Sequence, residues 1–255
     1  MDTSERFGGN KKVVITQDCS QTLFSTQFNE SYHSTKDGAL HESLVKHVKQ
    51  ALAFAPKKEK LTILDICFGL GYNTFATIYF MKQEGLRQKV HILSPEFDEA
   101  LVRSLKHFEY PSEFDMLQPM IQAISDTFYY EDEQFKIEVL IGDARESIPQ
   151  IKEKVNIVYQ DAFSPKQNPL LWTKEYFAQV RAICDQDVVL TTYSVATAIR
   201  MGLWENGFHI FEQQAQGVRD FTIASLKVLP LKEIDMVLKK LRNPVAKSLH
   251  DIDYS

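Results

Sequence analysis

Two glycines and several acidic residues stand where a protein could bind a nucleotide-like ligand. Gly69 and Gly71 follow an apolar run, residues 61–66, which contains a carboxylate at Asp65. Glycines at such a turn between a strand and a helix let backbone amides approach a ligand closely. Glu96 ends the next apolar run, and its separation from the glycines allows a carboxylate to reach the hydroxyls of a ribose.

The same arrangement recurs twice more along the chain. Asp143 follows the apolar run 136–141, and Asp161 follows the run 155–160. If these runs are parallel strands, their carboxyl ends meet at one edge of a sheet, where open α/β folds bind ligands. A tight turn alone would explain the paired glycines equally well, so it is the repetition that favours a binding site. We therefore predict an α/β fold with a mainly parallel sheet.

The composition restricts the kind of protein. A chain of 255 residues with 44% hydrophobic residues suits one large domain with a substantial core. No apolar run is long enough to span a membrane and residues 1–6 lack a signal-peptide pattern, so we predict a cytoplasmic protein without membrane contact. The three cysteines are far apart, and histidines such as His41 and His47 lack the spacing of a helical metal pair. We expect neither disulfides nor a metal site.

Apolar periodicity and capping residues place the helices. Residues 38–53 form a predicted amphipathic helix with an apolar inward face. The side chains expected on that face are Leu40, Leu44, Val45, Val48 and Leu52. Three further helices are predicted to begin after the N-cap residues Asp98, Thr173 and Ser194.

We divide the chain into three parts. Residues 1–37 are a predicted extension with short strands, of which 13–16 is the strongest candidate. Residues 38–230 are the main domain, with an insertion at 111–135 that is expected to contain a helix and a hairpin. Residues 231–255 are expected to form a C-terminal helix, starting at the beginning of this segment, and a tail.

Longer motifs narrow this prediction to a family. A mainly parallel sheet with an antiparallel final strand, here 221–226 because no helix precedes it, resembles the class I (Rossmann-like) S-adenosylmethionine-dependent methyltransferases. Residues 161–172 are similar to the Asp-Gly-Phe-x-Pro-x-x-Asn-Pro-x-x-Trp segment in the methyltransferase domain of MnmC, the bacterial tRNA wobble-uridine enzyme. Residues 68–73 resemble that family's Phe-Gly-x-Gly-x-Asn turn, and the similarity covers roughly residues 15–226.

The resemblance implies a specific reaction. It is methyl transfer from S-adenosylmethionine to the primary amine of 5-aminomethyl(-2-thio)uridine at the tRNA wobble position, which gives 5-methylaminomethyl(-2-thio)uridine. The family's other half, a flavin-dependent oxidase, has no counterpart, so we expect a stand-alone methyltransferase without flavin or metal. The implied partners are the tRNA anticodon loop and a separate flavin-dependent enzyme that supplies the aminomethyl substrate.

Three departures from the family pattern bear on this prediction. Cys67 replaces the first glycine of the turn, and Ala162 replaces the glycine that follows Asp161. Both are exchanges of one small residue for another, so they preserve the predicted pocket. A basic run before the last strand is reduced to Arg219 and Asp220, so positive charge for RNA must come from elsewhere.

The resemblance also assigns roles to residues. Asp161 is the implied catalytic residue, which orients the amine and stabilises the charge that develops on nitrogen. Keeping such an amine neutral at pH 7 costs about 4–5 kcal/mol, and only the neutral form has a lone pair. The implied cofactor-binding residues are Asp65, Phe68, Gly69, Gly71, Asn73, Glu96, Asp143 and Ala144. The implied substrate-binding residues are Tyr32, Ser34, Phe163, Lys166, Tyr193 and Arg219.

Within these sets, Glu96 is expected on the ribose, Asp143 on the adenine amino group, and Asp65 with Asn73 at the amino-acid end of the cofactor. Aromatic side chains such as Phe163 can stack on a splayed base. Trp172 is instead expected to pack its own loop.

Two other classes of function stay open. One is a small-molecule transferase, either a methyltransferase or an aminopropyl transferase of the spermidine synthase type, which shares the sheet and also places an aspartate after the fourth strand. The net charge of -5 favours this class over an RNA-binding protein. The other is a cofactor-binding scaffold without catalysis, in which Asp161 would be dispensable.

Overall fold

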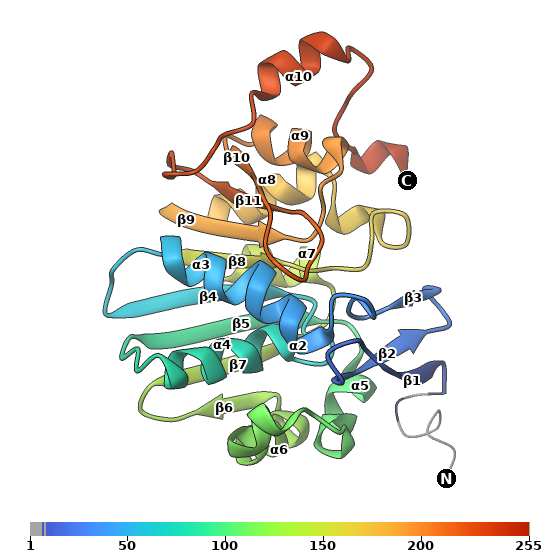
Figure 1. The fold of residues 1–255 in the computed structure, drawn as a ribbon, viewed down its shortest axis with the longest axis vertical. Coiled ribbons are helices and arrows are strands. Elements are labelled where there is room, and N and C mark those ends of the chain that lie inside the picture. Colours follow the sequence, from blue (N-terminus) through green and yellow to red (C-terminus); the bar gives the residue numbers. More distant parts are fainter. Residues whose placement is uncertain (1–6, 8, 255) are drawn as a thin grey trace.

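A central sheet of eight strands organises the chain (Figure 1). The computed structural model describes Phe7 and residues 9–254, so residues 1–6, 8 and 255, including the segment tested for a signal peptide, lie outside the described residues. The strands of the sheet are β4 Lys60–Ile66, β5 Lys89–Glu96, β6 Tyr129–Glu131, β7 Phe135–Ile141, β8 Val155–Gln160, β9 Cys184–Thr192, β10 His209–Gln213 and β11 Phe221–Ser225. Their order across the sheet is β10-β11-β9-β8-β4-β5-β7-β6.

Strand direction confirms the predicted fold class. β4 pairs in parallel with β5 and β8, and the parallel set continues through β7 on one side and β9 on the other. β11 lies between β9 and β10 and is antiparallel to both, as predicted for the late pair. β6 adds an antiparallel edge strand beside β7, and together they form the hairpin expected near residues 111–135.

Helices cover both faces of this sheet. They are α2 Ala39–Glu42, the π-helix η1 Ser43–Val48, α3 Lys49–Phe54, α4 Tyr72–Gln83, α5 Glu99–Ser104, α6 Gln118–Thr127, α7 Ala144–Ser147, α8 Lys174–Ile183, α9 Thr197–Glu205 and α10 Met236–Arg242. Short 3-10 turns are η2 Leu105–His107, η3 Ser112–Leu117, η4 Ile148–Gln150, η5 Pro169–Leu171 and η6 Asp251–Asp253. Figure 1 shows α2, α3 and α4 lying over one face. Among the described residues, no helix has the length and apolar character required to cross a membrane.

Alternation along β4 divides the core into two layers. Ile63 belongs to the cluster that includes α4 and α6, whereas Leu64 belongs to the cluster that includes α8 and α9. Successive side chains of a strand point to opposite faces, so a sheet covered on both sides needs apolar residues at almost every position. This requirement makes the carboxylate of Asp65, which is 1% exposed, conspicuous.

Two of the three predicted N-caps are confirmed. The Asp98 side chain accepts a hydrogen bond from Leu101 N at 2.9 Å, and Thr173 Oγ1 accepts one from Tyr176 N at 3.2 Å. The prediction for Ser194 is wrong, because α9 begins at Thr197 and has Ala196 as its N-cap. The Ser194 carbonyl accepts a hydrogen bond from the Thr222 hydroxyl, which keeps this residue at the end of the sheet.

The helix predicted over 38–53 has a different inward face from the expected one. Leu40 and Val48 are buried, but Leu44, Val45 and Leu52 are only partly buried. Its central part is the π-helix Ser43–Val48, whose wider turn changes the register of the side chains. The polar side chains that turn inward instead are Glu42, Ser43, Lys46 and His47.

Segments outside the sheet follow the predictions in part. The expected N-terminal strand is β1 Lys11–Ile15, which forms a three-stranded sheet with β2 Gln21–Ser25 and β3 Glu30–Ser31. In Figure 1 this small sheet lies beside the right-hand edge of the central sheet. The C-terminal helix begins at Met236, later than predicted, because Asp235 caps it and the chain before it hydrogen-bonds to β10.

A side chain at position 71 is expected to destabilise the protein. Its φ is +72°, and a Cβ at this position would lie 2.5 Å from the ring of Phe75. We expect Gly71→Ala to lower the free energy of unfolding by about 2–4 kcal/mol, because backbone strain adds to overpacking. Gly85→Ala is the matched control, since its φ is +63° but nothing lies within 4 Å of its Cβ. Urea denaturation measures the free energy of unfolding of both variants. Equal decreases would contradict the expectation that a Cβ at position 71 collides with the ring of Phe75.

Candidate active site

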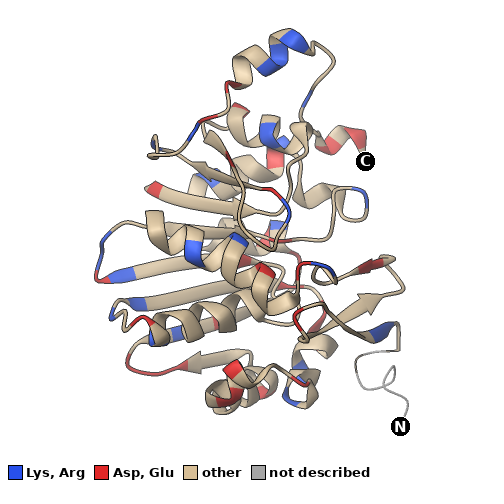
Figure 2. Ribbon diagram, in the orientation of Figure 1, with Lys and Arg blue, Asp and Glu red and all other residues tan. Residues whose placement is uncertain are grey.

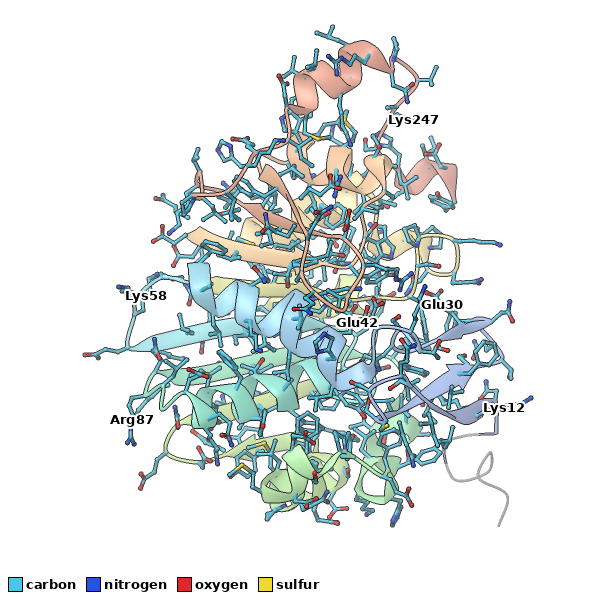
Figure 3. All side chains as sticks on the ribbon, in the orientation of Figure 1. Lys12, Glu30, Glu42, Lys58, Arg87 and Lys247 are labelled. Carbon is cyan, nitrogen blue, oxygen red and sulfur yellow. The ribbon has the colours of Figure 1, made fainter. Side chains whose placement is uncertain are left out.

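A cavity of about 930 Å³ opens at the carboxyl edge of the central sheet. It extends from the turns after β4, β5, β7 and β8 to the small N-terminal sheet. The predicted site residues that line it are Tyr32, Ser34, Phe68, Gly69, Asn73, Glu96, Asp143, Ala144, Asp161, Phe163, Tyr193 and Arg219. Of the labelled residues in Figure 3, Glu30 and Glu42 lie toward this edge, while Lys58 and Arg87 lie at the opposite edge.

Three predicted site residues do not line the cavity. Gly71 lies one residue before α4 and serves the turn rather than the cavity wall. Lys166 is exposed in the loop after β8. Asp65 is buried behind Asn73, where it accepts hydrogen bonds from Thr74 Oγ1 at 2.8 Å and from Asn73 Nδ2 at 3.4 Å.

Asp65 is therefore corrected from a direct cofactor contact to a support for Asn73. Burial, reinforced by the nearby charge of Asp161, raises the pKa of Asp65 to about 8. The carboxyl group is then mostly neutral at pH 7, which is how a strand can hold it within the core. A neutral acid gives no electrostatic attraction for the positively charged end of a cofactor.

The turn after β4 has the backbone of a glycine loop. Cys67, Gly69 and Gly71 have φ values of +63°, +54° and +72°. A positive φ at Cys67 is the conformation that glycine adopts without strain, which accounts for the family's glycine at this position. Gly69 N donates a hydrogen bond to Glu96 Oε2 at 2.7 Å, so the turn and the end of β5 are joined.

Glu96 and Asp143 occupy the ends of neighbouring strands. Glu96 also accepts from Asp98 N at 2.8 Å, and burial raises the pKa of its carboxyl group above the ordinary value. Asp143 caps α7 by accepting from Arg145 N at 2.8 Å. Both carboxylates face the cavity, where each retains lone pairs for a ligand hydroxyl or amino group.

Asn73 provides a test of whether S-adenosylmethionine fits. Its Nδ2 donates to Asp161 Oδ2 at 2.9 Å, while its Oδ1 is buried and has no hydrogen-bond partner among the described residues. A buried acceptor without a partner is costly unless a ligand donates to it. The ammonium group of the cofactor's amino-acid end is such a donor, so the residues present fit this cofactor.

Asp161 lies in the cavity wall, directly after β8. Burial alone would raise the pKa of this carboxyl group, but its interactions with His47, His33 and Asn73 hold the pKa below the ordinary value. Asp161 is therefore ionised at neutral pH. His47 Nε2 lies 3.6 Å from Asp161 Oδ1, an ion-pair distance longer than a hydrogen bond.

Sequence reasoning missed His47 completely. The spacing between histidines tests only for a metal pair, and it cannot reveal a histidine that contacts a carboxylate from another element. In a regular helix Lys46 would lie opposite the predicted apolar face, so the sequence gives no signal for the burial of Lys46 and His47. Their burial shows that this helix brings charge to the site as well as packing it.

Aromatic side chains form a second part of the cavity wall, which we call the aromatic half. Phe163 stacks on Phe28 with ring centroids 4.8 Å apart, and Tyr32 meets it edge-on at 4.9 Å. Tyr193 donates a hydrogen bond from its hydroxyl to Ala162 O. Trp172 is fully buried and donates from Nε1 to Phe163 O at 2.7 Å, which confirms that it packs its own loop.

Two polar contacts bind the surrounding segments together. Glu30, from the small N-terminal sheet, accepts hydrogen bonds from the backbone and side chain of Ser164. Arg219, from the loop between β10 and β11, lies 3.3 Å from Asp37. The cavity is thus enclosed by segments that are distant in sequence.

Comparison with known proteins identifies the family. A family model described as S-adenosyl-L-methionine-dependent methyltransferase matches residues 112–227. The crystal structure of MNMC2 from Aquifex aeolicus superposes with a TM-score of 0.82 at 31% identity, covering 95% of this chain and 79% of that one. The chain belongs to the MnmC methyltransferase family. It is thus an S-adenosylmethionine-dependent methyltransferase of MnmC type, as the motifs after β4 and β8 predict.

Curated relatives of this MnmC-type chain are longer. An uncharacterised protein of Methanocaldococcus jannaschii is 30% identical over 214 residues, which are 83% of this chain and 58% of that protein. The tRNA 5-methylaminomethyl-2-thiouridine biosynthesis bifunctional protein MnmC of Azoarcus is 29% identical over 203 residues, or 74% of this chain and 31% of that protein. The chain therefore spans little more than half of the first relative and about a third of the second.

Proposed function

We propose that this methyltransferase acts on the amine of 5-aminomethyl(-2-thio)uridine at the tRNA wobble position and produces 5-methylaminomethyl(-2-thio)uridine. The observation that carries the proposal is the position of the Asp161 carboxylate, which lines the same cavity as the glycine turn and the aromatic side chains. The name of the MnmC relatives, which specifies 5-methylaminomethyl-2-thiouridine biosynthesis, supports the same nucleoside. A flavin-dependent enzyme acting earlier on the same cytoplasmic tRNA would supply the aminomethyl group.

In this proposal the sheet edge holds the cofactor. Glu96 binds the ribose hydroxyls, Asp143 and Ala144 hold the adenine, and Asn73 Oδ1 accepts from the amino-acid end. Phe68 and Gly69 line the same side. The bound cofactor supplies a methyl group on a positively charged sulfur. The neutral state of Asp65 keeps a further negative charge away from this end of the cavity.

The aromatic half would hold the nucleoside. Tyr32, Phe163 and Tyr193 offer ring faces and edges to an unstacked base, which is how RNA-modifying proteins grip single nucleotides. Ser34 and Arg219 lie at the rim, where a ribose or phosphate would pass. Basic residues also gather on α10, as Figure 2 shows, and there they can meet the RNA backbone away from the cavity.

Asp161 would act on the amine itself. Its carboxylate accepts a hydrogen bond from an amine N–H, which aims the nitrogen lone pair at the methyl group, and it stabilises positive charge on nitrogen as the bond forms. Holding the two reacting groups in line contributes the larger part of the rate increase.

The nucleoside content of tRNA tests the assignment. In cells that lack this gene, mass spectrometry of digested tRNA is expected to show accumulation of the aminomethyl nucleoside and loss of its methylated form. Re-expression of the wild-type chain should restore the methylated form, and re-expression of Asp161→Asn should not. An unchanged nucleoside profile would contradict the proposal.

A small-molecule substrate is the second candidate, because the net charge of -5 does not favour RNA. Under this alternative the tRNA profile stays unchanged, while the purified protein methylates or alkylates a free amine. The aromatic contacts around Phe163 favour the nucleoside.

A further inference from the structure

Residues 248–253 follow α10 and dock on the loop that precedes α8 (Figure 1). The carbonyl of Leu249 accepts a hydrogen bond from Lys174 N at 2.8 Å, and Leu249 forms a parallel bridge with Thr173. Ser248 is 1% exposed, which shows that the start of this segment is packed into the protein. Within this described segment no residue lines the cavity, so the segment lies behind the cavity wall.

Asp251, in the middle of the segment, joins two parts of the cavity wall. Its carboxylate accepts two hydrogen bonds from the Arg145 guanidinium, one of them from Nη1 to Oδ1 at 2.7 Å. It also accepts a hydrogen bond from Thr173 Oγ1 at 2.7 Å. Arg145 lies in the first turn of α7 and lines the cavity, whereas Thr173 is the N-cap of α8 and ends the loop after β8. One carboxylate therefore links α7 to this loop.

The paired contact fixes the side chain of Arg145 in the wall. Hydrogen bonding by Arg145 holds the pKa of Asp251 below its ordinary value, so the carboxyl group is ionised at neutral pH. Two parallel hydrogen bonds between a guanidinium and a carboxylate fix the guanidinium plane as well as its position. Arg145 Nη1 also donates to Leu170 O at 3.3 Å, and Leu170 is a second residue that lines the cavity.

A wall residue that is fixed in advance favours ligand binding. A free arginine side chain samples many rotamers, and a ligand that packs against it must order it on binding. Arg145 directly follows Asp143 and Ala144, which hold the adenine in the proposed function. The inference therefore rests on that part of the proposed function. A planar guanidinium can also pack against an aromatic ring system such as adenine.

We propose that Asp251 is a positioning residue for S-adenosylmethionine, which holds Arg145 and the turn at Leu170 in place as the wall beside the adenine. Asp251 itself has no place in the cavity and acts through Arg145. Its effect is to prepare the wall before the cofactor arrives. Such preorganisation lowers Kd without adding a contact to the ligand.

The segment has anchors that do not involve the Asp251 carboxylate. His250 Nδ1 lies 2.8 Å from Glu175 Oε1, and the backbone N of Asp251 donates to Glu175 Oε2 at 3.1 Å. These contacts hold the segment on α8 when the side chain of Asp251 is changed. A substitution of that side chain therefore tests the link to Arg145 and not the docking of the segment.

Asp251→Asn tests the proposal, because asparagine keeps the size of the side chain but offers Arg145 one acceptor in place of two. We expect the Kd for S-adenosylmethionine, measured by calorimetry without tRNA, to rise about 3- to 10-fold, the range for ordering one long side chain on binding. In the methyl-transfer assay the KM for S-adenosylmethionine should rise by the same factor, while kcat changes less than about twofold. A partly unfolded enzyme would instead show a lower kcat with an unchanged KM.

Arg145→Gln breaks the same pair from the other side and should raise the Kd for S-adenosylmethionine at least as much. In this background Asp251→Asn should cause no further rise, because the two residues act through one contact. Asp253→Asn is the matched control in the same segment. Asp253 pairs with Lys247 and accepts a hydrogen bond from His250 N, for which asparagine keeps an acceptor. It should leave the Kd at the wild-type value.

An unchanged Kd in Asp251→Asn, or a rise that persists in full in the Arg145→Gln background, would overturn the inference. Asp143→Asn separates this failure from a failure of the proposed adenine site. If Asp143→Asn weakens cofactor binding and Asp251→Asn does not, this inference alone is overturned. If neither variant weakens binding, the placement of the adenine is overturned as well. The binding measurement uses no tRNA, so its result is independent of the nucleoside assigned to the enzyme.

Discussion

Asp161→Asn is expected to abolish methyl transfer while the cofactor still binds. The substitution keeps the shape of the side chain but removes the charge that orients the amine and stabilises the developing positive charge on nitrogen. We expect kcat to fall by about 10³-fold or more, since such a preorganised group contributes several kcal/mol to transition-state stabilisation. Steady-state assays with aminomethyl-containing tRNA measure kcat, and calorimetry measures the Kd for S-adenosylmethionine.

Asp185→Asn is the matched control for this substitution. Asp185 is a partly exposed carboxylate that pairs with Lys58, which is labelled at the edge opposite the cavity in Figure 3. It should leave kcat and the Kd for S-adenosylmethionine at their wild-type values. If Asp161→Asn keeps more than about a tenth of the wild-type kcat, electrostatic catalysis by this carboxylate is contradicted. The scaffold interpretation, in which Asp161 is dispensable, would then gain support.

Lys46→Met is expected to produce the largest loss of stability. The Lys46 ammonium is 1% exposed and pairs with the buried carboxylates of Asp37 and Glu42. Methionine fits the volume but leaves Glu42 without its cation and Asp37 with only the exposed Arg219. Removing one partner of a buried ion pair costs about 3–5 kcal/mol. Urea denaturation at pH 7 measures the free energy of unfolding.

The pH dependence of this loss gives a second readout. Burial acts to raise the pKa of Asp37, but hydrogen bonding and the charge of Lys46 hold it below its ordinary value. A lowered pKa contributes stability above the unfolded value of about 3.9, and that contribution disappears as the pH falls through the folded value. The difference between wild type and Lys46→Met should therefore narrow in acid.

Lys58→Met controls for the loss of a lysine as such. Lys58 also pairs with a carboxylate, Asp185, but its side chain is 42% exposed. Exposed pairs contribute little, so we expect a change below about 1 kcal/mol. Equal effects of the two substitutions would contradict the structural role given to the buried Lys46.

Local chemistry explains which features could be predicted from the sequence. The strand ends marked by Glu96, Asp143 and Asp161 were found because a buried parallel strand is an apolar run, and the polar residue after it marks the sheet edge. The caps at Asp98 and Thr173 could also be predicted, because a cap depends only on the residues of its own next turn.

The parts that were missed depend on contacts between distant segments. Asp65 was expected to touch the cofactor, but its place behind Asn73 depends on how α4 lies on β4. His47 meets Asp161 and Thr191 only after the first helix packs across the ends of β8 and β9. Its π-helical turn also moved the inward face away from Leu44 and Val45, a shift that regular 3.6-residue periodicity does not anticipate.

Incubation of the purified chain with S-adenosylmethionine and tRNA carrying 5-aminomethyluridine tests the central claim most directly. Mass spectrometry of the digested tRNA should show the methyl group on the exocyclic amine, and should show none when Asp161→Asn is used. Methylation elsewhere on the nucleoside, or no methylation in the presence of bound cofactor, would contradict the account.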